Sequence, residues 1–245
     1  MRAGCQTMTS SFHDTRWTLV SRSRGSDAQA QAALSELCEA YYAPVVAFLR
    51  RDGRAEDVAR DLAHDFFAKL LAGGTIDGAD PLRGKFRSYL LTVLKRFAAN
   101  QRIHDHAAKR GGGQIHAAID GESDTTGAGL QIADTSIEAP DAAFDRQWAL
   151  TLLARALGRL DSEMRDGGKS EHFEVLKPWL TADGDATPQS DAARKLGMSI
   201  EAIKVAIHRL RKRFREAVKA EIAQTVSDAD TVREELDALM GALRK

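Results

Sequence analysis

The most informative local pattern in the chain runs from Ser190 to Leu210 and reads SDAARKLGMSIEAIKVAIHRL. Its first part predicts a short helix that ends at Gly197, because glycine adopts a left-handed turn at little cost. We expect Met198 to plug the turn and Ser199 to cap the next helix through its hydroxyl. On that second helix, apolar side chains share an arc of about 80°: Ile200, Ile203, Ile207, Leu210 and Phe214. The pattern predicts a helix-turn-helix.

The opposite face of this second helix is polar and basic. In a DNA-binding helix-turn-helix, such a face enters the major groove of duplex DNA. Contacts with base edges there give sequence specificity, and contacts with phosphates position the protein on the duplex. The alternative is an amphipathic helix in a bundle, with its polar face in solvent. The glycine turn and the basic flank favour DNA recognition. The candidate contact residues are Ser199, Glu201, Lys204, Val205, His208, Arg209, Arg211 and Lys212.

The formal net charge is zero, from 35 basic and 35 acidic residues, but the charge lies in blocks. Residues 81–110 hold eight basic residues and one acid, a net charge of +7, and residues 199–219 have a net charge of +5. Residues 111–145 hold seven acids without Lys or Arg, and residues 221–239 hold six acids and one Arg. Because salt screens charges beyond about 8–10 Å, each segment sets its own field, and zero net charge does not exclude nucleic acid.

The 245 residues, 43% of them apolar, suit one large domain or two small ones, and the apolar spacing is helical. Gly, Ser, Thr and Asp dominate residues 111–143, as in a flexible linker. We therefore expect an all-α protein with two small helical domains, at 26–110 and 144–220, joined by this acidic linker. An N-terminal arm (1–25), anchored by Trp17 and Leu19, precedes them. A helical extension (221–245) follows, either as a control element or as a helix covering the second domain.

The pattern predicts helices over 28–41, 55–71, 83–103 or 86–103, 144–160, 171–180, 190–196, 199–220 and 228–243, with Pro44 kinking or breaking the first one. The last of them places four apolar side chains on one face: Val232, Leu236, Leu239 and Leu243.

The helix predicted over 55–71 has two contrasting faces. Val58, Leu62, Phe66 and Leu70 form a core seam in this prediction. Asp57, Asp61, His64 and Asp65 lie together on the other side. Such an acidic face is either simply exposed to solvent or a docking surface for a basic partner helix.

The helix beginning at Phe86 carries aromatic and aliphatic side chains on one face: Phe86, Tyr89, Leu90, Val93 and Phe97. Arg87, Lys95 and Arg102 share another face and form a cationic stripe. Basic stripes near aromatics are typical of proteins that bind melted or single-stranded DNA. A solvated basic face is the alternative.

Signals for catalysis are weak. The sequence has no P-loop, GxSxG or HExxH motif, and His104 and His106 point in different directions on a helix. We expect no enzyme activity, no cofactor and no metal.

Cys5 and Cys38 form no CxxC pair, the first 25 residues contain no apolar signal region, and no apolar run reaches the roughly 20 residues of a membrane helix. These features predict a cytoplasmic protein without membrane insertion.

Three stretches in this order resemble bacterial RNA polymerase sigma factors of the extracytoplasmic-function type, within the sigma-70 family. Residues 55–67 (AEDVARDLAHDFF) resemble region 2.2, in which Gln usually stands where this chain has His64. Residues 86–102 resemble regions 2.3 and 2.4, and the helix-turn-helix resembles region 4.2. The resemblance covers most of residues 30–110 and 144–216.

The resemblance implies a sigma factor that binds core RNA polymerase, through its β′ clamp and β flap, and directs promoter-specific initiation. It assigns Asp57, Asp61, His64 and Asp65 to the clamp, and the helix-turn-helix candidates above to the −35 element. It assigns the −10 element to Arg83, Lys85, Arg87, Lys95, Arg96, Asn100 and Arg102. It leaves open an anti-sigma factor or another regulator as a partner. Two alternatives remain: a helix-turn-helix regulator that is not a sigma subunit, and a sigma-like interaction protein.

Overall fold

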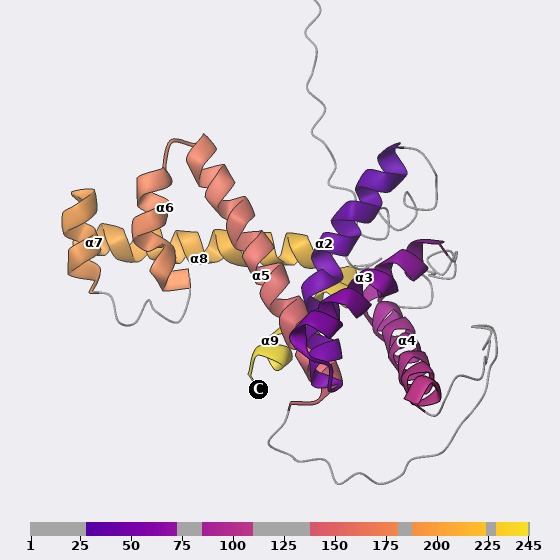
Figure 1. Cartoon of the computed structure of the whole chain (residues 1–245). Coiled ribbons are helices and arrows are strands. Elements are labelled where there is room, and N and C mark those ends of the chain that lie inside the picture. The colour runs from indigo at the N-terminus through magenta and orange to yellow at the C-terminus, as the bar shows by residue number, and fades with distance from the viewer. Residues whose placement is uncertain (1–27, 73–84, 110–137, 181–187, 224–228, 245) are drawn as a thin grey trace, which may run out of the picture.

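The computed structural model describes residues 28–72, 85–109, 138–180, 188–223 and 229–244. Over these residues the chain is helical and has no strand, which confirms the all-α prediction for the described part. The elements are α2 (Ala28–Arg51), α3 (Glu56–Ala72), α4 (Phe86–Lys109), α5 (Pro140–Asp166), α6 (Ser170–Leu176), the 3₁₀ helix η3 (Lys177–Leu180), α7 (Gln189–Leu196), α8 (Ile200–Ala223) and α9 (Ala229–Leu243) (Figure 1). The predicted anchors Trp17 and Leu19, the candidate Arg83 and linker residues 111–137 lie outside the described residues.

Helix α2 continues past Pro44 to Arg51, so the predicted end near Tyr41 is wrong. A proline inside a helix removes one backbone donor and disfavours the preceding turn. Here the residues that follow it are deeply buried, since Val45, Phe48 and Leu49 are at most 3% exposed. Burial of these three side chains compensates for the cost of the proline.

Helix α5 begins at Pro140, four residues before its predicted start, and extends to Asp166. Proline suits the first turn of a helix because its missing N–H would have no intrahelical partner there. The last residues of the predicted linker, 140–143, are therefore helical. With 27 residues, α5 is long enough to contact both groups of buried side chains described next.

A first core contains buried side chains from both predicted domains. Helices α2, α3 and α4 contribute one set and α5, α8 and α9 another. Tyr41, Phe66, Phe86 and Leu90 from the first set pack with Phe144, Trp148, Ile222 and Leu239 from the second. Residues on both sides of the predicted linker thus share one core, while the separate folding of each domain stays a prediction.

A second core lies between the remaining helices. It contains Leu160 and Met164 from the end of α5, Phe173 and Leu176 from α6, and Trp179 from η3. The helix-turn-helix adds Ala192, Ala193, Ile203, Ile207 and Leu210. Figure 1 shows α5 and α8 running from this end of the molecule to the α2–α3–α4 end. These two long helices connect the cores and position the helix-turn-helix relative to α4.

Helix α9 packs its predicted apolar face against the first core. Leu239 is 1% exposed, and Val232, Leu236 and Leu243 are partly buried there. Helix α9 contacts α5 and α8 of the predicted second domain and also α4 of the first. Both roles expected for the extension, a control element or a cover for the second domain, stay predictions. None of the described helices combines the length and apolarity that crossing a membrane requires.

Candidate functional site

The helix-turn-helix has the turn geometry that the sequence predicts. Gly197 ends α7 in the left-handed conformation, with φ of 62°. The N–H of Met198 donates to the Ala193 carbonyl at 3.0 Å, and its side chain packs against the second core. The hydroxyl of Ser199 accepts a bond from the Ala202 N–H at 3.2 Å, so it caps α8 as expected.

The polar face of α8 is open to solvent. Its buried side contains Ile203, Ile207 and Leu210, while Ile200 at the start of the helix is 43% exposed and departs from the predicted core set. The candidate side chains on the other face are all exposed: Glu201, Lys204, Val205, His208, Arg209 and Lys212. This face combines one carboxylate, one imidazole, three cations and one apolar side chain. Such a mixture is suited to contacts with base edges and phosphates.

Two of the eight helix-turn-helix candidates also make contacts within the protein. Ser199 is the helix cap, and Arg211 donates from Nε to the Trp179 carbonyl at 3.0 Å. The Arg211 contact joins α8 to η3. Their assignment to DNA stays a prediction, and the six exposed side chains form the freer part of the candidate surface.

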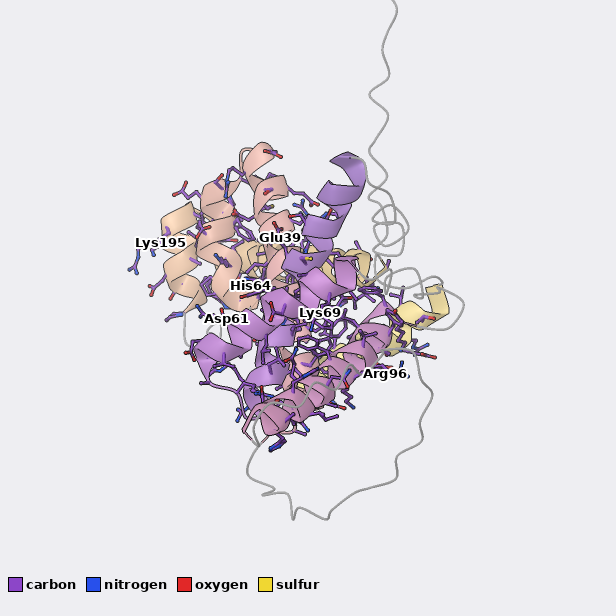
Figure 2. All side chains as sticks on the ribbon, turned by 45° about the vertical axis from the view of Figure 1, so that its right-hand side comes forward. Glu39, Asp61, His64, Lys69, Arg96 and Lys195 are labelled. Atoms are coloured by element: carbon purple, nitrogen blue, oxygen red, sulfur yellow. The ribbon has the colours of Figure 1, made fainter. Side chains whose placement is uncertain are left out.

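Helix α3 presents its acidic side chains to solvent. Asp57, Asp61, His64 and Asp65 are all exposed, and Figure 2 shows Asp61 and His64 on one side of the view and Arg96 on the other. The buried face differs from the prediction, because Val58 is 40% exposed and Leu62 only half-buried. Phe66 and Leu70 are buried as predicted, and Ala59, Ala63 and Phe67 are buried with them.

Small side chains explain this shift. Ala59 and Ala63 are fully buried in the first core, and their size lets α3 approach α2 closely. Val58 is left beside the carboxylates of Asp57 and Asp61, which gives the acidic face an apolar neighbour. The imidazole of His64 lies against the ring of Tyr42, with 5.2 Å between the ring centroids. This contact orients His64 on the surface.

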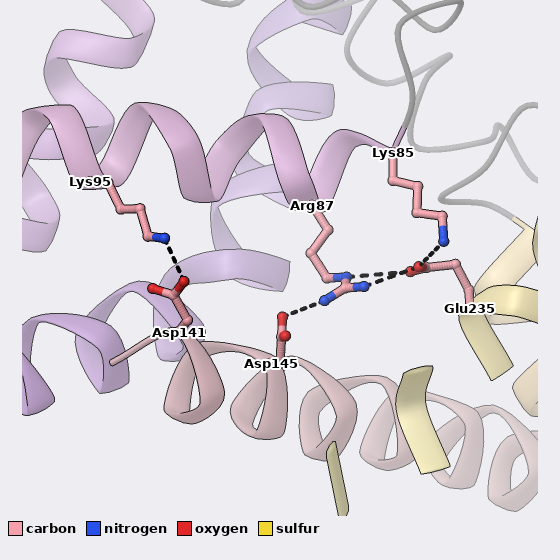
Figure 3. Close-up of polar contacts among 6 residues, drawn as sticks. All are labelled: Lys85, Arg87, Lys95, Asp141, Asp145 and Glu235. Atoms are coloured by element: carbon pink, nitrogen blue, oxygen red, sulfur yellow. Dashed lines mark hydrogen bonds and ion pairs between the residues drawn. The ribbon is translucent and has the colours of Figure 1, made fainter. Parts of the chain in front are cut away.

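Helix α4 buries one side and binds carboxylates with another. Phe86 and Leu90 are buried as predicted, together with Leu94 and Ala98. All three cations of the predicted stripe bind carboxylates: Arg87 with Asp145 and Glu235, Lys95 with Asp141, and Arg102 with Asp52 (Figure 3 for the first two). The stripe is thus paired with acids from α5, α9 and the end of α2.

The densest of these contacts surrounds Glu235 of α9, whose side chain is 1% exposed. Arg87 approaches its carboxylate with two nitrogens, Nη2 at 3.0 Å and Nε at 3.3 Å. Lys85 places Nζ 3.0 Å from Glu235 and 3.3 Å from the exposed Glu234. The guanidinium of Arg87 also lies over the Trp148 ring.

These carboxylates change the acid–base properties of both cations. Burial alone would lower the pKa of Lys85, but its contacts with Glu235 and Glu234 outweigh burial and raise it. Burial likewise opposes the charge of Arg87, and Glu235 and Asp145 raise its pKa. Both groups therefore remain cationic at neutral pH despite their partial burial.

The other −10 candidates are arranged differently. Arg96 is exposed, and none of the described carboxylates pairs with it. Asn100 is half-buried on the same helix. The candidates thus divide into a carboxylate-bound group (Lys85, Arg87, Lys95 and Arg102) and the open Arg96.

Sequence reasoning missed Glu235, Trp148 and Asp52 as partners of the basic helix. One signal was available for Glu235. It lies three residues after Val232 and four before Leu239, so it falls within the apolar stripe of α9. A single charge in such a stripe indicates a buried partner of opposite charge.

A hollow near the start of α3 and α5 is lined by Arg50, Arg51, Arg54 and Arg146. Each of these cations pairs with a carboxylate from Glu56, Glu138 or Asp105, and no predicted site residue lines the hollow. In the described part of the chain, no three His, Cys, Asp or Glu side chains gather as metal ligands.

Compared with known protein families, curated proteins and solved structures, the chain gives no match.

Proposed function

We propose that the protein is a sigma factor, a cytoplasmic subunit that binds core RNA polymerase and directs it to promoters. The observation that carries the proposal is the pair of exposed faces on one helical frame: the acidic face of α3 and the polar face of α8. They occur in the order that the resemblance to sigma factors implies. The chain supplies binding surfaces and does no chemistry of its own.

The acidic face of α3 is the proposed contact for core polymerase. Asp57, Asp61 and Asp65 are exposed, and none of the described cations pairs with them. Unpaired carboxylates on a rigid helix steer and orient a basic partner. Val58, 40% exposed, adds an apolar contact at the edge of this face. A coiled coil of the β′ clamp is the expected partner.

The polar face of α8 is the proposed reader of the −35 element. Its cap and left-handed turn fix the start of the helix, where a recognition helix meets base edges. Lys204, Arg209 and Lys212 supply phosphate or guanine contacts, and exposed Val205 can meet a thymine methyl group.

Helix α4 is the proposed contact for the −10 element. Binding would capture unstacked bases of one strand, which offsets the few kcal/mol that unstacking costs. Arg96 is available on the free protein, whereas Lys85, Arg87, Lys95 and Arg102 must exchange their carboxylates for phosphates.

The test is binding of the full-length protein to purified core polymerase from the same organism. Asp61→Lys with Asp65→Lys should weaken binding about ten-fold or more, because two attractive charges become repulsive. Asp166→Lys with Glu171→Lys is the control of equal charge change, on exposed residues away from α3. Equal binding by both double variants would reject the α3 assignment, and no binding by the unaltered chain would reject the proposal.

A second candidate is a helix-turn-helix regulator that reads duplex DNA without polymerase. The observation in its favour is that the α8 face is open in the free chain, whereas all three cations of the α4 stripe are paired with carboxylates. Tight, sequence-specific duplex binding by the protein alone would support this candidate over the sigma factor.

A further inference from the structure

We infer that Lys85 and Arg87 form a binding site for one phosphate of single-stranded DNA, and that Glu235 of α9 fills this site in the free chain. DNA then engages this end of α4 only when α9 withdraws its carboxylate. The inference rests on the proposed DNA-binding role of α4.

The first support is the geometry around the Glu235 carboxylate. Arg87 presents two nitrogens to it, at 3.0 and 3.3 Å, and Lys85 presents a third at 3.0 Å. Three donors with two positive charges that converge on one carboxylate suit a phosphate equally well, since Arg forks bind both groups. Figure 3 shows Lys85 and Arg87 reaching Glu235 from neighbouring positions at the start of α4.

The second support is that Arg87, one of the two cations of the site, is held in place by residues outside α9. Arg87 bonds to Asp145 of α5, and its guanidinium lies 4.5 Å from the centroid of the Trp148 ring. The Arg87 side chain is only 12% exposed. A guanidinium fixed on two sides keeps its orientation when Glu235 leaves, so Arg87 is preorganised for another anion.

The third support is the balance of energies in α9. Its contact with the first core includes one fully buried apolar side chain, Leu239, while Met240 is 45% exposed. A buried ion pair adds little net stability because desolvation offsets attraction, but a buried cation without any anion is strongly unfavourable. When α9 withdraws, Arg87 keeps Asp145, but Lys85 loses both of its carboxylates, Glu235 and Glu234, so the site favours a replacement anion such as a phosphate.

The fourth support is multivalency. The segment that contains this site has a net charge of +7, and Arg96 on the same helix is exposed and has no carboxylate partner among the described residues. A DNA strand that first contacts Arg96 brings further phosphates to the helix at high effective concentration. The two carboxylates of α9 at this site, Glu235 and Glu234, are then the weaker competitors.

The direct test measures binding of the full-length protein to a fluorescein-labelled, mixed-sequence single strand of roughly 20 nucleotides, by anisotropy at low salt. Glu235→Gln should raise affinity about ten-fold or more, which corresponds to the loss of one charge-assisted contact. Asp237→Asn is the matched control, since it removes the same charge from an exposed position of α9 that has no ion pair among the described residues. Equal affinity of the two variants would overturn the inference.

A second measurement uses the unaltered chain and so does not depend on how the variants fold. A water-soluble carbodiimide should join the Lys85 amine to the carboxylate of Glu235 or Glu234, which lie 3.0 and 3.3 Å away. Mass spectrometry of the digested protein would identify the linked peptides. The yield should fall several-fold when the same DNA strand is saturating, and an unchanged yield would overturn the inference.

These results separate this inference from the proposed function. If the chain binds core polymerase but Glu235→Gln does not raise its affinity for the single strand, the sigma assignment stands and competition by α9 is rejected. A chain that gains affinity but does not bind core keeps the phosphate site and loses the sigma assignment.

Discussion

The guanidinium of Arg87 lies 4.5 Å from the centroid of the Trp148 ring. Arg87 belongs to the basic helix α4, and Trp148 belongs to α5, on the far side of the predicted linker. A cation over an indole face is attracted by the electron-rich face of the ring quadrupole, which contributes about 2 kcal/mol or more when desolvated. The contact therefore links the proposed DNA-binding helix to the shared first core.

Trp148→Ala should destabilise the protein by about 3–5 kcal/mol, because it removes a large side chain that is 2% exposed together with its contact to Arg87. The free energy of unfolding from urea titration measures this. Leu150→Ala on the same helix is the control, since Leu150 is 43% exposed, and a change within about 0.5 kcal/mol is expected. Similar losses for both variants would contradict a shared core centred on Trp148.

Gly197→Ala should cost about 1–2 kcal/mol, because φ of 62° is unfavourable for a residue with a Cβ atom. Gly158→Ala is an informative comparison. That glycine lies inside α5 with open space around its Cβ position, so alanine there should stabilise the protein by about 0.5–1 kcal/mol. Thermal unfolding of both variants tests the turn, and shifts of the same sign would argue against it.

The thiol of Cys38 should ionise at unusually high pH. Burial, aided by the charge of Glu39, raises its pKa to about 11. The thiol ionises at lower pH in the unfolded chain than in the native one. The free energy of unfolding therefore falls as pH rises from about 9 towards 11. In a Cys5→Ser protein, the rate at which iodoacetamide reacts with Cys38 should rise with pH, with a midpoint near pH 11 for the native chain. A native midpoint near that of the denatured chain would show that the thiol is open to solvent.

Arg209 and Arg211 should respond differently to substitution. Arg209 is exposed on the α8 face, and Arg209→Ala should weaken binding to the −35 duplex by about 1–3 kcal/mol if its fork reads a guanine. Arg211 is bonded to the Trp179 carbonyl, so Arg211→Ala should chiefly lower stability, by about 1 kcal/mol. Duplex titrations and urea unfolding of both variants separate the two roles. A larger loss of DNA affinity from Arg211 would reverse this assignment.

Local geometry was predictable from the sequence where neighbours in the chain determine it. The turn at Gly197, the cap at Ser199 and the buried face of α8 depend on residues within a few positions of one another. The exposed acidic face of α3 likewise follows from helical spacing. Even so, the prediction that Val58 is a core residue is wrong, because burial of Ala59 and Ala63 in its place depends on how closely α2 approaches.

Long-range contacts were not predictable in the same way. Arg87 and Glu235 are separated by 148 positions, and no local pattern indicates that they meet. The continuation of α2 past Pro44 also depends on a core assembled from distant helices. The distribution of charge along the sequence did predict separate basic and acidic segments. Which cations pair with Asp141, Asp145 and Glu235, however, is determined by the shared first core.

Reconstituted transcription tests the central claim most directly. Core polymerase from the same organism, mixed with the full-length protein and genomic fragments, should start transcripts at defined positions. Footprints should cover two elements spaced as −35 and −10, and Asp61→Lys with Asp65→Lys should abolish both signals. No stable complex with core and no defined start sites, from a correctly folded protein, would contradict the account.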